Sequence, residues 1–171
     1  GQAGQSETWN NYNTPQLVDD TRVYVDVGVS DQHSCALTDA GDIYCWGYDN
    51  DCVGVLGDGN WCQTYTSPNL VQGGLTFAQL RVSHNHVCGI TTTSEGYCWG
   101  DNHRGQLGDG TQNHWNTPVR AGLILFSDID PGGNHTCGIK TDGVAVCWGG
   151  NDRGELGTGG LLGPVYLYRD K

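Results

Sequence analysis

Several residue types are scarce in this chain, and each scarcity narrows what the protein can be. Among 171 residues there are no methionines, two phenylalanines and two lysines. The longest apolar run is AGLILF, residues 121–126, which is far shorter than the roughly 20 residues of a membrane-spanning helix. Lysine and arginine number 8 against 19 acidic residues, a formal net charge of −11 at pH 7. Because neutralising phosphates requires clustered cations, we expect neither nucleic acid nor an anionic membrane as a partner.

Other signals are missing as well. The chain has no initiator methionine and no charged-then-apolar leader, so we expect a processed or excised form. No window sustains the i, i+3, i+4, i+7 apolar pattern of a long helix. Neither a Gly-x-Ser-x-Gly elbow, a His-Glu-x-x-His pair nor a glycine-rich phosphate loop with lysine is present. The sequence therefore predicts a protein that is not an enzyme and needs no cofactor.

Glycine, tryptophan, tyrosine and cysteine are instead well supplied, with 28, 6, 8 and 8 residues respectively. Glycine-rich turns between short aromatic and β-branched runs are typical of a chain built from many short strands. The composition therefore predicts an all-β fold.

Three segments of the chain repeat one another. They read HSCALTDAGDIYCWG from His33, HVCGITTTSEGYCWG from His86 and HTCGIKTDGVAVCWG from His135. The starts are 53 and then 49 residues apart, a period that is typical of propeller blades and other repeat architectures. Each hairpin is followed by a tail of the type Gly-x-Leu-Gly that ends in a small residue and proline.

These motifs resemble the repeats of the regulator of chromosome condensation family. The matching residues are His33, His86, His135, the Trp-Gly pairs at 46–47, 99–100 and 148–149, Asn102, Asn151 and Gly105–Gly108. The resemblance covers residues 15–171 and implies a β-propeller, usually seven-bladed, with four-stranded blades around an axis. Two features depart from the family pattern: only three hairpins are present, and each carries a cysteine pair that the nuclear members lack.

The repeats divide the chain into units of about 50 residues, at about 16–67, 68–117 and 118–171, preceded by a surplus tail at 1–15. Tails number four, at Gly1–Pro15, Gly54–Pro68, Gly105–Pro118 and Gly154–Pro164. GPVYLYRD, from Gly163, is expected to start a further blade that is never finished. Three blades are too few to close a propeller, so we expect an open wedge or one completed by oligomerisation.

Open ends of this kind leave strand edges that pair readily with another chain. The two ends of the wedge are unlike, and contacts between unlike ends give a ring or an open filament. We therefore expect residues 1–15 to pair with a neighbouring, identical subunit by strand addition.

The cysteines are expected to form four local disulfides: Cys35–Cys45, Cys52–Cys62, Cys88–Cys98 and Cys137–Cys147. In each hairpin a turn lies midway between the two cysteines, which places them opposite one another on paired strands. The Cys-x-x-Cys knuckle of many zinc sites is missing. Disulfides indicate an oxidising compartment, so the sequence predicts a secreted, extracellular protein. Asn134 begins a glycosylation sequon, Asn-His-Thr.

Some side chains raise the question of a binding site. His33, His86 and His135 occupy equivalent positions and could bind a metal, although a hydrogen-bonding role within each blade is the stronger expectation. Asp49, Asp51 and Asp58 lie in one loop, but their spacing does not match the calcium-binding loop of an EF-hand.

The tryptophans fall into two groups. Trp46, Trp99 and Trp148 follow a cysteine and are expected to pack between blades. Trp9, Trp61 and Trp115 lie in polar loops and are candidates for contact with a protein, or else for stacking on a sugar or for loop packing.

Two functions remain open, and they belong to different classes. The first is an extracellular, self-assembling structural protein whose identical subunits join head to tail. The second is a secreted propeller module that binds another protein or a glycan. Nucleotide exchange on a small GTPase, as in nuclear relatives, is disfavoured because it conflicts with the disulfides.

Overall fold

The computed structural model describes residues 12–49 and 51–159, and in these residues it contains β-strands and no helix. The strands are β1 (Tyr24–Val29), β2 (His33–Thr38), β3 (Ile43–Tyr48), β4 (Thr64–Leu70), β5 (Phe77–Val82), β6 (His86–Thr91), β7 (Glu95–Gly100), β8 (Trp115–Pro131), β9 (His135–Lys140) and β10 (Ala145–Gly149). Nothing in the described part of the chain is a helix long and apolar enough to cross a membrane.

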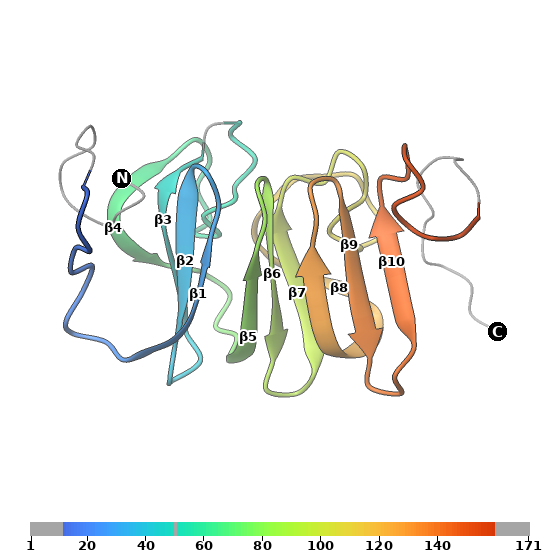
Figure 1. The fold of residues 1–171 in the computed structure, drawn as a ribbon, viewed down its shortest axis with the longest axis horizontal. Coiled ribbons are helices and arrows are strands. Elements are labelled where there is room, and N and C mark those ends of the chain that lie inside the picture. Colours follow the sequence, from blue (N-terminus) through green and yellow to red (C-terminus); the bar gives the residue numbers. More distant parts are fainter. Residues whose placement is uncertain (1–11, 50, 160–171) are drawn as a thin grey trace.

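The strands form three antiparallel blades that lie side by side along the long axis of the molecule (Figure 1). Blade one is the sheet β1-β2-β3-β4. The second sheet runs β10-β9-β8-β7-β6-β5 and contains two blades, because the long strand β8 serves both. Its first part, from Trp115, pairs with β7, and its second part, Phe126–Pro131, pairs with β9. Blade two is therefore β5, β6, β7 and the first part of β8, and blade three is the second part of β8 with β9 and β10.

Each central hairpin turns through a residue with positive φ. Gly41 and Gly143 hold this position in blades one and three, with φ of 89° and 85°. Blade two places Ser94 there instead, with φ of 67°. Glycine adopts this left-handed conformation without the Cβ penalty that serine incurs, so the second hairpin turn is the strained one.

The core lies between the blades. Between blades one and two, the Cys35–Cys45 disulfide and Leu37 belong to one buried cluster with Leu80 and Trp99. Between blades two and three, the corresponding cluster contains Cys88, Cys98, Ile90, Ile129 and Trp148. Each blade thus stacks its disulfide-bearing face on the next blade, and burial of this apolar area is the main force that holds the stack together.

The all-β fold and the propeller-type blades expected from the sequence are confirmed, and the described blades form an open array. The expected repeat boundaries at 67/68 and 117/118 fall inside β4 and β8, because the proline after each tail lies within a strand of the preceding blade. Of the surplus tail at 1–15, only residues 12–15 are among those described, and the segment from Gly163 lies outside them.

Candidate functional site

The loop that connects β3 to β4 is held in shape by one buried carboxylate. Asp49, 2% exposed, accepts hydrogen bonds from the backbone N–H groups of Val53, Gly54 and Cys62 at 3.0–3.2 Å. The Cys52–Cys62 disulfide closes the same loop. Asp49, which the sequence raised as a calcium ligand, is therefore occupied by the backbone of its own loop.

The equivalent loop of blade two uses a related set of contacts. Asn102 Nδ2 donates to Asp109 Oδ1 at 3.0 Å, and Asn102 Oδ1 accepts from the N–H of Leu107 at 3.0 Å. The buried carboxylate of Asp101 lies 2.7 Å from His103 Nδ1 and 3.0 Å from His114 Nδ1. Both loops are therefore fixed by internal polar contacts, although they carry exposed side chains.

The two loops are joined directly. Gly59 N–H donates to the carbonyl of Asn116 at 2.9 Å, and Asn116 Nδ2 donates to the carbonyl of Gly59 at 2.7 Å. Trp61 lies two residues beyond Gly59, and Trp115 directly precedes Asn116. The reciprocal pair therefore brings together the loop that carries Trp61 in blade one and the start of β8, where Trp115 lies, in blade two.

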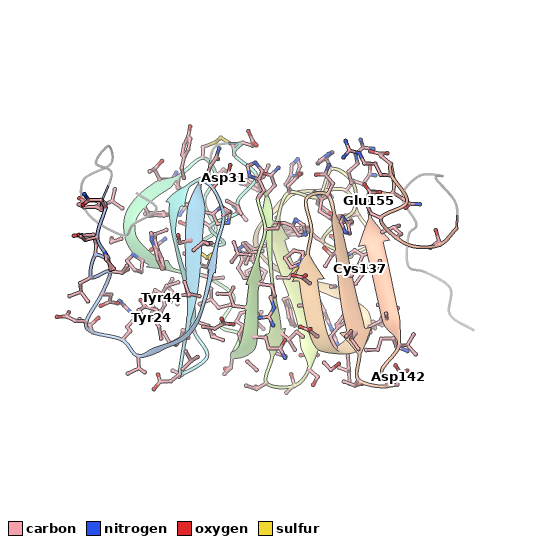
Figure 2. The ribbon with its side chains drawn as sticks, viewed as in Figure 1. Tyr24, Asp31, Tyr44, Cys137, Asp142 and Glu155 are labelled. Atoms are coloured by element: carbon pink, nitrogen blue, oxygen red, sulfur yellow. A yellow bond between two sulfur atoms is a disulfide. The ribbon has the colours of Figure 1, made fainter. Side chains whose placement is uncertain are left out.

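We call this surface the rim and define it as residues 51–63 and 101–116. Trp61 and Trp115 are 44% and 38% exposed, and the Trp115 indole donates to Asp109 Oδ2 at 2.9 Å. The rim lies at the end of the blades that carries Asp31 and Glu155, opposite the hairpin turn of Asp142 (Figure 2).

The rim is acidic. It contains four carboxylates and one arginine; Asp58 and Asp101 are buried, and Asp51 and Asp109 reach the surface. That arginine, Arg104, lies 3.1 Å from the carboxylate of Asp152. The rim therefore combines exposed aromatic surface with negative charge, a combination that suits a positively charged partner.

Beneath the rim, the blades are fastened to one another by indole–carbonyl hydrogen bonds. Trp99 Nε1 donates to the carbonyl of Val55 at 3.0 Å, and Trp148 Nε1 donates to the carbonyl of Gln106 at 2.8 Å. Val55 and Gln106 occupy the same position of the Gly-x-Leu-Gly tails. We call the Trp99–Val55 contact between blades one and two, with the residues around it, the first joint. The Trp148–Gln106 contact between blades two and three, with its surroundings, is the second joint.

The second glycine of each tail lets the indole approach. A Cβ placed on Gly57 would lie 2.7 Å from Trp99 Nε1, and one on Gly108 would lie 2.6 Å from Trp148 Nε1. Both glycines have positive φ, 71° and 72°. Any larger residue at either position would separate the blades.

The second joint has an additional polar relay. Thr136 Oγ1 donates to the Gln106 carbonyl at 2.7 Å, and His86 Nε2 lies 2.9 Å from the same hydroxyl. The hydroxyl has one proton, which it gives to the carbonyl, so the imidazole Nε2 carries a proton and donates. Ser83 Oγ binds the other ring nitrogen of His86 at 3.0 Å.

The first joint lacks this hydroxyl. Val87 stands where blade three has Thr136, and the Nε2 atom of the buried His33 finds no hydrogen-bond partner in the described chain. Ser30 Oγ binds the other ring nitrogen, Nδ1, at 2.9 Å. Burial lowers the pKa of His33 to about 4 and that of His86 to about 3, so both rings are neutral at pH 7.

His33 and His86 thus lie at the first and second joints, and His135 begins β9 at the corresponding place in blade three. Within residues 12–49 and 51–159, no group of three His, Cys, Asp or Glu side chains could hold a metal ion.

Other sequence candidates are placed as follows. The disulfides are Cys35–Cys45, Cys52–Cys62, Cys88–Cys98 and Cys137–Cys147. Asn134 is exposed in the loop before β9. Trp9 lies outside the described residues. Trp99 and Trp148 lie between blades, as the sequence predicted. The hydrogen bonds of the joints were not predicted, although a hydroxyl residue follows two of the three repeat histidines, at Ser34 and Thr136.

Family models match the chain in three places. Models described as the regulator of chromosome condensation (RCC1) repeat match residues 24–52, 96–139 and 126–155, together more than half of the sequence. The chain belongs to the RCC1 repeat family.

Curated relatives of this RCC1-repeat chain include much longer proteins. It is 35% identical over 96 residues to the probable E3 ubiquitin-protein ligase HERC4 of Rattus norvegicus, and 38% identical over 96 residues to the E3 ubiquitin-protein ligase HERC2 of Homo sapiens. Each match covers 55% of this chain, but only 9% and 2% of those proteins.

Solved structures share the fold. Human WBSCR16 matches with a TM-score of 0.72 and 21% identity over 86% of this chain and 40% of that one. Yeast RCC1 (Prp20), in a structure bound to Kap60, matches with a TM-score of 0.67 and 23% identity over 86% of this chain and 36% of that one.

Proposed function

We propose that this RCC1-repeat chain is a non-enzymatic protein-binding module whose partner contacts the rim. The observation that carries the proposal is the Gly59–Asn116 pair, which fixes two exposed tryptophans from different blades on one acidic surface. Large aromatic side chains with a polar tip are enriched among the residues that dominate binding energy at protein interfaces.

The construction of the rim supports this proposal. Its loops are held by a disulfide, by Asp49 and by Asn102, so little conformational entropy is lost when a rigid partner binds. Its excess of carboxylates favours a partner with a basic patch. A structural neighbour also binds a protein, since yeast RCC1 was solved bound to Kap60.

Affinity capture tests the proposal. The immobilised chain is exposed to proteins of its own extracellular medium, and a Trp61→Ala/Trp115→Ala variant is compared with a Leu123→Ala control, whose side chain is 81% exposed away from the rim. We expect the double variant to lose the captured protein and the control to retain it, with capture weakening as salt rises. Undiminished capture by the double variant would contradict the proposal. Capture of a glycan alone would show that the module binds a glycan and not a protein.

We also propose that the module is extracellular. Four disulfides in one small domain support this location, because reducing compartments keep thiols free. Alkylation of the natural protein without reductant, followed by mass spectrometry, should find no free thiol at the eight cysteines. Extensive labelling would place the protein in a reducing compartment.

Self-association of identical chains, as a ring or filament, is the second candidate function. The observation that favours it is that apolar side chains are exposed on both blade one and blade three, Val27 and Val29 on the former and Ile139 on the latter. A protein binder and a self-assembling subunit can be distinguished by mass in solution.

A further inference from the structure

The turn that leads into β9 presents an exposed asparagine. Asn134 directly precedes the strand, and its carbonyl accepts a hydrogen bond from the N–H of Gly150 at 2.7 Å. This contact uses the main chain, whereas the side chain of Asn134 is exposed. A Cβ placed on the neighbouring Gly133 would meet no described atom within 4 Å, so the space beside the turn is open. Asn134 therefore presents its side-chain amide to solvent where a bulky group has room.

Two positions further along the chain, Thr136 completes the N-glycosylation sequon Asn-His-Thr. Unlike Asn134, Thr136 is 0% exposed. Its hydroxyl donates to the Gln106 carbonyl and contacts the imidazole of His86 in the second joint. The two residues that define the sequon thus have opposite surroundings, one in solvent and the other between two blades.

The equivalent turns of the other blades each lack one residue of the sequon. Blade one reads Gln-His-Ser at residues 32–34, with a hydroxyl but no asparagine, and blade two reads Asn-His-Val at 85–87, with an asparagine but no hydroxyl. The carbonyls of Gln32 and Asn85 accept main-chain hydrogen bonds at 2.9 and 2.8 Å, as that of Asn134 does, but both residues are half-buried. Of the three turns, the one with the complete sequon is also the one whose residue at this position is most exposed.

We propose that Asn134 carries an N-linked glycan. The inference rests on the proposed extracellular location and not on the rim, because this modification is made on secreted chains. In the transfer, the side-chain nitrogen of Asn134 attacks C1 of an oligosaccharide that is held on a lipid-linked diphosphate donor. A bond from this nitrogen to C1 forms and the bond from C1 to the phosphate oxygen breaks. The lipid diphosphate leaves with the electron pair of the broken bond, and the nitrogen loses one proton.

The burial of Thr136 determines when the transfer takes place. The acceptor sequence requires the hydroxyl of its third residue. In the folded chain this hydroxyl is held by the Gln106 carbonyl and by His86, so a transferase reaches it only before blade three packs on blade two. Thr136 accordingly serves twice, first in the acceptor sequence of the unfolded chain and then as the hydroxyl of the second joint.

The glycan projects from the rim end of blade three. β9 starts at the Asn134 turn and runs towards the hairpin turn of Asp142, which lies at the end opposite the rim (Figure 2). Blade two lies between this turn and the 51–63 loop of blade one (Figure 1). Loss of the glycan is accordingly expected to leave Trp61 as exposed as before, so the glycan and the protein contact can be tested separately.

Peptide mass spectrometry before and after peptide-N-glycosidase treatment tests the proposal, on the natural protein and on the full 171-residue chain secreted from cultured eukaryotic cells. We expect a glycan on Asn134 in both and complete loss of it in Asn134→Gln. Thr136→Ser, which keeps a hydroxyl in the sequon and in the joint, should retain the glycan. Asn113→Gln is the matched control, because Asn113 is also exposed and followed by histidine but belongs to no sequon, and it should retain the glycan too.

The outcomes separate this inference from the proposal on which it rests. A natural protein with all eight cysteines in disulfides and an unmodified Asn134 would refute the glycan and leave the extracellular location standing. Free thiols at those cysteines would instead refute the extracellular location.

The order of glycan transfer and folding has its own test. The oxidised, folded chain and the reduced, unfolded chain, both without glycan, are incubated with detergent-solubilised microsomal membranes that contain the transferase and its lipid-linked donor. We expect modification of Asn134 in the unfolded chain only. Equal modification of the folded chain would overturn the inferred order.

Discussion

The first and second joints are built on the same indole–carbonyl contact and differ by one hydroxyl. In the second joint, Thr136 links the His86 ring to the carbonyl that already receives the Trp148 indole. In the first joint, Val87 replaces the threonine, the Trp99 indole is retained, and His33 Nε2 is left without a described partner. The repeat therefore tolerates loss of the relay but keeps the indole, which identifies the indole as the principal contact.

The difference matters for function because the first joint supports the rim. Val55, the acceptor for Trp99, belongs to the loop that carries Trp61 and the Cys52–Cys62 disulfide. The 51–63 loop of the rim thus lies over the joint with fewer hydrogen bonds, whereas the 101–116 segment contains Gln106 of the second joint. Local opening is expected to be easier there than between blades two and three.

Removing either indole should have the largest effect. Trp99 and Trp148 are 0% and 2% exposed, so Trp99→Ala and Trp148→Ala should each lower the free energy of unfolding by about 3–5 kcal/mol. Urea denaturation measures both, with Leu123→Ala, at a side chain that is 81% exposed, as a control expected to change stability by less than about 0.5 kcal/mol. A loss below about 1 kcal/mol for either buried tryptophan would mean that the joints do not hold the blades.

Acidification should weaken both joints next most strongly, because burial lowers the pKa of His33 and of His86, and His33 allows the first joint to be tested separately. Because burial lowers the pKa of His33 from 6.5 to about 4, the unfolded chain binds more protons in this range, and stability is lost as the pH falls from about 6.5 towards 4. The loss from this ring is on the order of 3 kcal/mol. Unfolding free energies at pH 7 and pH 4.5 should differ less in His33→Gln than in the unaltered chain, since carboxylates contribute to both. Equal differences in the two proteins would contradict the assignment.

Moving the hydroxyl from the second joint to the first should reverse which of the two joints contributes more to the free energy of unfolding. Thr136→Val leaves the fully buried His86 Nε2 without its acceptor and should cost about 1–3 kcal/mol. Val87→Thr supplies an acceptor for His33 Nε2 and a donor to the Val55 carbonyl, and should stabilise by about 1 kcal/mol. Both are measured by urea denaturation. Destabilisation by Val87→Thr would show that the first joint is packed for valine and not deficient in a hydroxyl.

The hairpin turns allow a smaller test. Ser94→Gly should stabilise the chain by up to about 1 kcal/mol, because Ser94 has a φ of 67° where the other blades use glycine. Thermal denaturation should show a raised midpoint, whereas Gly143→Ser should lower it. No change in either variant would indicate that the turns relax without cost.

The sequence predicted the blades well because their signals are local. The recurring His-x-Cys and Cys-Trp-Gly segments lie within one hairpin, so their spacing defines strands, turn and facing cysteines together. The packing of Trp99 and Trp148 between blades was predicted, but the hydrogen bonds of the joints were missed because their partners are distant: Thr136 lies 30 residues from Gln106 and 50 from His86. Which faces meet depends on blade stacking, and no periodicity in the sequence encodes it.

The rim was predicted only in part, for the same reason. The polar surroundings of Trp61 and Trp115 indicated exposure, but the hydrogen bonds that bring their loops together connect Gly59 and Asn116, 57 residues apart. His33, His86 and His135 were expected mainly to hydrogen-bond within their blades, and Ser30 and Ser83 do contact the rings of the first two, but the contact of His86 with Thr136 of the next blade was not predicted. Equivalent positions in the repeats indicate equivalent roles, but the packing of the blades decides which contacts each residue makes.

Hydrogen exchange of the indole N–H groups tests the difference between the joints most directly. NMR spectra recorded after transfer to D₂O at pH 7 should show that the Trp148 Nε1 proton is lost more slowly than that of Trp99, because its acceptor is held by Thr136 and His86. Val87→Thr should slow exchange at Trp99 and leave Trp148 unchanged. Equal protection of the two indoles, or greater protection of Trp99, would contradict the account.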